Sequence, residues 1–149
     1  MAYRYKSTAV LAPLTVSTTE TILQLRTPAT SRCQVWGWTF SFDGVTAVDD
    51  PILCRVTRQT NTGTAASGLE VPLDPNSPTA LTTAHITFSA EPTTGAVLTG
   101  AYAHPQGGFV EEQLSHPIIL DVSDFLGFRV TPGALTTTTN AAVSVLFEE

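Results

Sequence analysis

The stretch of sequence that decides the fold is Gln34-Val35-Trp36-Gly37-Trp38-Thr39-Phe40-Ser41-Phe42. Successive side chains of a β-strand point to opposite faces of the sheet, so a period of two marks a strand with one apolar face. We predict a strand over Cys33–Phe42 whose four aromatic side chains share a face: Trp36, Trp38, Phe40 and Phe42. Because large aromatic side chains are mostly buried, we expect this face to line a core. The alternative is an exposed aromatic platform that binds carbohydrate.

Short apolar runs separated by turn residues continue along the rest of the chain. The other candidate strands are Tyr3–Val10, Thr21–Arg26, Ile52–Arg58, Leu69–Val71, Ala84–Ser89, Val97–Tyr102, Phe109–Leu114, Ile118–Val122, Phe128–Thr131 and Ala141–Phe147. Clusters of Gly, Pro, Asn and Asp lie between them, and turns about 8–12 residues apart are typical of sandwiches and barrels. Few windows keep the period of a helix. The sequence predicts an all-β protein, a single-domain antiparallel β-sandwich that is jelly-roll-like, over residues 1–149.

Composition favours the same fold class. The chain has 149 residues, of which 42% are hydrophobic and only 13% are charged. Threonine occurs 25 times, and this β-branched residue suits a half-buried strand better than a helix. A chain of this length buries about 68–70% of its unfolded surface, which is enough for a core without disulfides or metals. The low charge suits a surface that is covered by partner proteins.

Charge is distributed unevenly along the chain, whose net charge is −6. Residues 1–58 contain six of the seven basic side chains, whereas residues 59–128 contain no Lys or Arg. That second segment carries seven acids: Glu70, Asp74, Glu91, Glu111, Glu112, Asp121 and Asp124. We interpret them as residues of solvated loops. An acidic chain without a basic cluster argues against a nucleic-acid partner.

No segment has the length or hydropathy of a signal peptide or a transmembrane helix, so we expect no membrane partner and synthesis in a cytoplasm. Cys33 and Cys54 are too few for a disulfide framework and lack metal-ligand spacing. We predict that both are free thiols. If Cys33–Phe42 and Ile52–Arg58 form a hairpin, the two cysteines are too far apart along it for a bridge.

Residues with catalytic or metal-binding chemistry occur without a recognisable motif. The histidines are widely spaced: His85, His104 and His116. Three aspartates near one loop, Asp43, Asp49 and Asp50, have the oxygen ligands that Ca²⁺ prefers, but a role in turns is the stronger interpretation. Glu111 and Glu112 are adjacent, so on a strand they point in opposite directions. We predict no enzyme, no cofactor and no metal site.

The N-terminus combines two cations with two amphipathic rings, in Tyr3, Arg4, Tyr5 and Lys6. This composition suits docking on an acidic or mixed neighbouring surface, which makes these four residues candidate assembly contacts. Residues 1–8 form either a free arm or an edge strand of the protein's own sheet, and the sequence leaves both open.

Several segments of turn and core residues are characteristic when taken together: Trp36–Gly44, Leu73–Pro75, Ala90–Thr93, His104–Phe109, Leu126–Thr131 and Val145–Glu149. They resemble small all-β structural proteins of tailed bacteriophages and prophages, over the chain from about Ala9 to its end. Such proteins are often of the capsid decoration (auxiliary or cementing) type.

The resemblance implies a virion structural protein on the outer surface of the head. Its partner would be the major capsid protein, and it would form a homo-oligomer, with a trimer favoured. The alternative is a jelly-roll module of a phage tail or surface protein that binds a carbohydrate or a receptor. No capsid-contacting residue can be carried over from the resemblance.

Overall fold

The computed structural model describes residues 2–11 and 13–149, and these residues form strands, turns and loops without a helix. The strands are β1 (Arg4–Leu11), β2 (Glu20–Arg26), β3 (Cys33–Phe42), β4 (Ile52–Gln59), β5 (Thr64–Ser67), β6 (Glu70–Pro72), β7 (Thr83–Ala90), β8 (Thr94–Ala103), β9 (Phe109–Leu120), β10 (Phe125–Thr131) and β11 (Ala141–Glu148).

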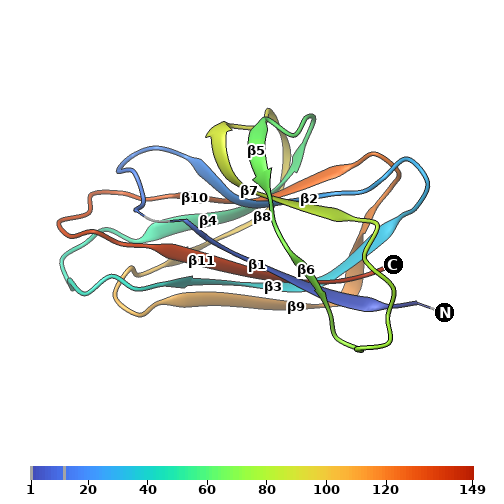
Figure 1. The fold of residues 1–149 in the computed structure, drawn as a ribbon. Helices are drawn as coiled ribbons and strands as arrows, with labels where there is room; N and C mark the ends of the chain where they lie inside the picture. Colours follow the sequence, from blue (N-terminus) through green and yellow to red (C-terminus); the bar gives the residue numbers. More distant parts are fainter. Residues whose placement is uncertain (1, 12) are drawn as a thin grey trace.

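Two antiparallel sheets pack face to face (Figure 1). Sheet A has five strands in the order β6-β1-β11-β3-β9, and sheet B has six in the order β5-β7-β2-β10-β4-β8. Both ends of the chain lie at the same end of the sandwich. There the backbones of Tyr3 and Glu149 exchange two hydrogen bonds, at 2.9 and 3.0 Å. The predicted all-β sandwich is confirmed.

The strand pairing is nested. β1 pairs with β11, β2 with β10, β3 with β9, and β4 with β8. The first half of the chain therefore runs antiparallel to the second half as one long double ribbon, which folds over so that its successive pairs alternate between the sheets. Further ladders between β3 and β11 and between β4 and β10 close each sheet. This is the jelly-roll arrangement that the sequence predicted.

An insertion between β4 and β8 lies on one side of the sandwich. Its strand β6 extends sheet A beyond β1, while β7 and β5 extend sheet B beyond β2. The paired strands β5 and β7 rise above the rest of the fold (Figure 1). On the opposite side of the sandwich, β9 and β8 are the last strands of their sheets.

Aromatic side chains from both sheets meet in the core. Phe128 of β10 lies against Trp38 and Phe40 of β3, with ring centroids 5.9 and 6.3 Å apart. All three side chains are buried, as is Phe42. On β11, Val143, Val145 and Phe147 continue the same face. The predicted burial of Trp38, Phe40 and Phe42 is confirmed.

Trp36 does not belong to this face, and that part of the prediction is wrong. Gly37 pairs with Leu146 and Val35 with Phe147, so Trp36 is an extra residue in the ladder to β11. Such a β-bulge changes which face the following side chains take. Trp36 is only partly buried, and the guanidinium carbon of Arg4 lies 5.9 Å from its ring centroid on the outer face of sheet A.

Three other sequence predictions differ from the structure. β5 was not expected, since Thr64–Ser67 has no apolar run. The candidate strand Phe109–Leu114 and the first three residues of Ile118–Val122 belong to one strand, β9, which continues through Pro117 and ends at Leu120. Proline is tolerated there because β9 is an edge strand and its register with β3 shifts nearby.

The third difference concerns the hairpin of Cys33–Phe42 with Ile52–Arg58, which was only a condition in the distance argument for the cysteines. β3 and β4 lie in different sheets and do not pair, so that condition is not met. In a nested ribbon, the connection from β3 to β4 crosses between the sheets, whereas adjacency in sequence suggested direct pairing.

The two tryptophans of β3 provide a matched test of the bulge. Replacing Trp38 by Ala removes a buried aromatic and should lower the free energy of unfolding by ~3–5 kcal/mol. Replacing Trp36 by Ala removes a partly buried ring and one cation–π contact, so we expect about 1–2 kcal/mol. Chemical denaturation of both variants measures the difference. Equal losses would contradict the outward placement of Trp36.

Candidate assembly surface

The four N-terminal candidate residues lie in or beside strand β1, which pairs with β11 along its whole length and with β6 over Tyr5–Ser7. From Arg4 onward the segment is therefore a strand of the protein's own sheet and not a free arm. It lies one strand in from the edge, because β6 is the outermost strand of sheet A. Met1 lies outside the described residues. Because the pattern of a strand has period two, the four side chains divide between the faces of the sheet.

Tyr5 faces the core and is not available to a partner. Its side chain is 1% exposed, stacks on Phe147 with centroids 5.4 Å apart, and donates a hydrogen bond to the carbonyl of Pro78 at 3.0 Å. Burial, with the nearby Glu149 carboxylate, raises the pKa of Tyr5 above its ordinary value. Tyr3 is partly buried.

Arg4 and Lys6 lie on the exposed outer face of sheet A. The Nε of Arg4 donates to Glu148 at 2.9 Å, and its guanidinium covers Trp36. Lys6 is in none of the ion pairs that the described residues form. Of the four candidates, Lys6 is thus the most available charge.

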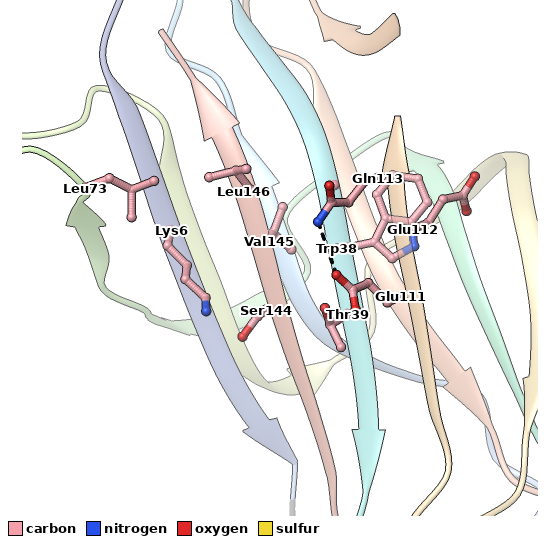
Figure 2. A pocket seen from close by; sticks show the side chains of 11 residues that line it. Lys6, Trp38, Thr39, Leu73, Glu111, Glu112, Gln113, Ser144, Val145 and Leu146 are labelled. Carbon is pink, nitrogen blue, oxygen red and sulfur yellow. Dashed lines mark hydrogen bonds between the residues drawn. The ribbon is translucent and has the colours of Figure 1, made fainter. Parts of the chain in front are cut away.

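A shallow groove of about 320 Å³ crosses this outer face (Figure 2). Lys6 of β1 lies on one side of it, and Glu111 and Gln113 of β9 lie on the other, with Ser144 and Thr39 between them. The amide of Gln113 donates to the Glu111 carboxylate at 3.2 Å. The groove therefore has a cationic side and an anionic side, separated by the widths of β11 and β3.

A second hollow, of about 440 Å³, opens where β8 and β9 diverge. Trp38 borders it, together with Leu98, Leu114 and Ile118. Its two charged residues are Arg58 and Glu112. The Arg58 guanidinium is held by the Asp124 carboxylate at 2.8 Å and donates to the carbonyl of Ile119 at 2.7 Å. The hollow is thus mostly apolar, with a fixed cation at its rim.

The strands that border this hollow expose large apolar side chains: Val97, Leu98, Tyr102, Phe109 and Ile119. We call the edges of β8 and β9 with these side chains the open side. Within residues 2–11 and 13–149, β8 pairs only with β4, and β9 only with β3. Sequence reasoning missed this surface. The available signal was residues 96–103, which carry no charge and show no alternation.

The candidate Ca²⁺ ligands instead hold loops together. Asp43 accepts from the backbone N–H and the amide of Asn140, at 2.6 and 2.7 Å. Asp49 accepts from the backbone N–H and the hydroxyl of Thr136, both at 2.6 Å, and Asp50 accepts from the N–H of Ala134 at 3.0 Å. The structural interpretation of these aspartates is confirmed.

The histidines lie apart, His85 on β7, His104 in the turn after β8 and His116 on β9. Over the described part of the chain, no three His, Cys, Asp or Glu side chains group in a way that could hold a metal.

Both cysteines are buried free thiols, as predicted. Cys33 lies on β3 and Cys54 on β4, in different sheets. Burial raises the pKa of each thiol to about 12. Because the thiolate is the nucleophile, neither thiol is reactive in the folded protein near neutral pH.

Comparison of the chain with family models, with characterised proteins and with solved structures finds no match. None of the described residues forms a helix that is long and apolar enough to cross a membrane.

Acid should weaken the loop contacts of Asp43 and Asp49. The Asn140 N–H and amide lower the pKa of Asp43, and the Thr136 hydroxyl and N–H lower that of Asp49, from the ordinary value of 3.8. A lowered pKa in the folded state contributes stability above the unfolded pKa, and this is lost as pH falls through the folded pKa. Asp49→Asn should therefore reduce Tm at pH 7, and its difference from wild type should shrink toward pH 3. Thermal melts across this range would refute the idea if the difference stayed constant.

Alkylation should find both cysteines protected. We expect native protein at pH 8 to take up no iodoacetamide, and protein unfolded in denaturant without reductant to take up two labels. Intact-mass spectrometry counts the labels. Rapid labelling of the native protein, or a mass two hydrogens lighter after unfolding, would contradict this.

Proposed function

We propose that this protein is a virion structural protein that decorates the outer surface of a tailed-phage head, where it binds the major capsid protein and stabilises the shell. The sequence resemblance and the jelly-roll sandwich support the proposal. Jelly rolls also occur in lectins and enzymes, so the fold alone does not assign a role.

The observation that carries the proposal is the open side. Edge strands present unpaired backbone groups, and soluble proteins usually protect them with charge, proline, bulges or a covering segment. Here the insertion extends both sheets on the other side. β9 carries two acids and Pro117, which protect its edge, whereas β8 contains neither charge nor proline. β8 stays uncovered and exposes Val97 and Tyr102, and Phe109 of β9 is exposed nearby. A surface of this kind suits a protein that works inside an assembly.

Decoration would stabilise a head by mass action. A ligand that binds only the assembled shell stabilises it by RT ln(1 + [L]/Kd) for each site, and a shell offers many sites. Such a role needs a rigid scaffold and a complementary surface, and it requires no catalytic group.

The second candidate function is binding of a carbohydrate or receptor. It is favoured by two exposed aromatics, Tyr102 and Phe109, which flank the turn between β8 and β9. It is not favoured by β3, because Trp38, Phe40 and Phe42 are buried and Trp36 is covered by Arg4. An exposed platform of the four β3 aromatics is therefore excluded.

Undecorated phage heads and a glycan array separate the two functions. We expect wild-type protein to bind heads at a saturating stoichiometry set by the lattice and to raise their melting temperature. Val48→Ser, in the exposed loop after β3, is a control outside the open side and should bind heads as wild type does. Binding to a sugar that Tyr102→Ala with Phe109→Ala abolishes, without binding to any head, would decide for the alternative.

A further inference from the structure

We propose that copies of this chain associate head to tail, with the open side of one copy on the β1–β6 side of the next. This deepens the proposed function and rests on it, since it names the contact by which a decoration protein would form a ring. The occupant of the open side is then a second copy of the same chain.

The open side combines two features that favour binding of another protein, unpaired strand edges and exposed apolar side chains. β9 has twelve residues and β8 has ten, and each leaves one strand edge unpaired within the described chain. Beside these edges, Val97, Tyr102 and Phe109 are 53%, 70% and 66% exposed. Unpaired edges next to apolar side chains favour association.

Two open sides do not fit one another. β9 carries Glu111 and Glu112, and residues 59–128, which include β8 and β9, contain no Lys or Arg. A two-fold contact would bring two acidic open sides together, and neither β8 nor β9 could offer Glu111 a Lys or Arg. Arg58, the cation at the rim, is already held by Asp124. Arg55 lies beside Gly100 of β8 on the outer face of sheet B, whereas Glu111 lies on the outer face of sheet A. A cation on the outer face of sheet A is therefore the complement that Glu111 calls for.

The opposite edge of the same sheet has the complementary character. Lys6 is exposed on β1 and takes part in none of the ion pairs of the described residues. Next to it, β6 and its flanks expose three apolar side chains: Leu69, Val71 and Leu73. Figure 2 shows Lys6 and Leu73 on one side of the outer face and Glu111 on the other.

The acids on the β1–β6 side are engaged within the chain. Glu70 accepts from the backbone N–H of Ala84, and Asp74 accepts from that of Asn76. Glu148 binds Arg4. These carboxylates keep their charge but are held by donors of the same chain. Lys6 has no ion-pair partner among the described residues, so it is the side chain that a neighbouring Glu111 would meet.

A contact between two different patches is heterologous, so it propagates from copy to copy until the rotation closes a ring. The two patches lie at opposite edges of sheet A, where one copy can contact two neighbours at once. This arrangement is compatible with the trimer expected from the resemblance.

Charge exchange tests the contact directly. We expect Lys6→Glu and Glu111→Lys each to weaken association about tenfold or more, and the double variant to recover most of the loss. Sedimentation equilibrium measures the association constant, and circular dichroism verifies the fold. Val48→Lys, in an exposed loop, is the matched control and should associate as wild type does.

Mixing the two single variants tests the ring number. In an even ring the variants can alternate, so that every contact pairs opposite charges. In a ring of three, one contact always joins like variants and stays repulsive. We therefore expect the mixture to recover less association than the double variant.

Three results would overturn the inference: a monomeric wild type at high concentration, single variants that associate like wild type, or a double variant without recovery. Binding to phage heads separates a failure of this contact from a failure of the proposed function. If wild type binds heads but the single variants associate normally, the proposed function stands and this contact is wrong. If the charge exchange behaves as expected but no head is bound, this contact stands and the proposed function is wrong.

Discussion

The contact of Phe128 with Trp38 and Phe40 is the interaction on which the rest of the sandwich depends. It joins β10 in sheet B to β3 in sheet A, and both are interior strands of their sheets. Each of these strands pairs with neighbours on both sides, so their side chains have fixed positions. Close packing in a core requires such fixed neighbours. The edge strands β9 and β8 are then positioned by hydrogen bonds to β3 and β4.

The position of the insertion explains why one side of the sandwich is left apolar. A sandwich of two open sheets has two sides where edges are exposed, and this chain uses residues between β4 and β8 to extend the sheets on only one of them. The hydroxyl and amide groups of Thr21, Gln24 and Gln59 are linked by hydrogen bonds on sheet B, and Asn61 of the insertion accepts from Gln24 at 2.9 Å. The insertion is thus integrated into the fold, whereas β8 is exposed on both faces along most of its length.

The sequence predicted those features that depend on local period and turn residues. The bounds of β3 match, and most other strands lie within a few residues of their predicted ranges, because alternation and turn residues are local signals. The bulge at Trp36 was not predictable, since it depends on the register of β11 and β9 against β3. Adjacency in sequence allowed β3 to pair with β4, but the nested ribbon separates consecutive strands into different sheets. β5 has no apolar run and is defined only by its pairing with β7.

The candidate assembly residues show the same division between local and long-range information. Period two correctly implies that Tyr5 and Lys6 face opposite ways, yet only the packing of Phe147 and the carbonyl of Pro78 identifies Tyr5 as the inward one. The open side was missed for a related reason. Val97, Tyr102 and Phe109 have the side chains of core residues, and whether they are buried depends on what lies beyond β8 and β9. The insertion covers the other side instead, so apolar residues that would be interior in a closed sandwich stay at the surface, next to the acids of a segment without cations. In the proposed head-to-tail contact, Lys6 on the outer face of sheet A is the cation from outside that segment, and it meets Glu111 of the next copy.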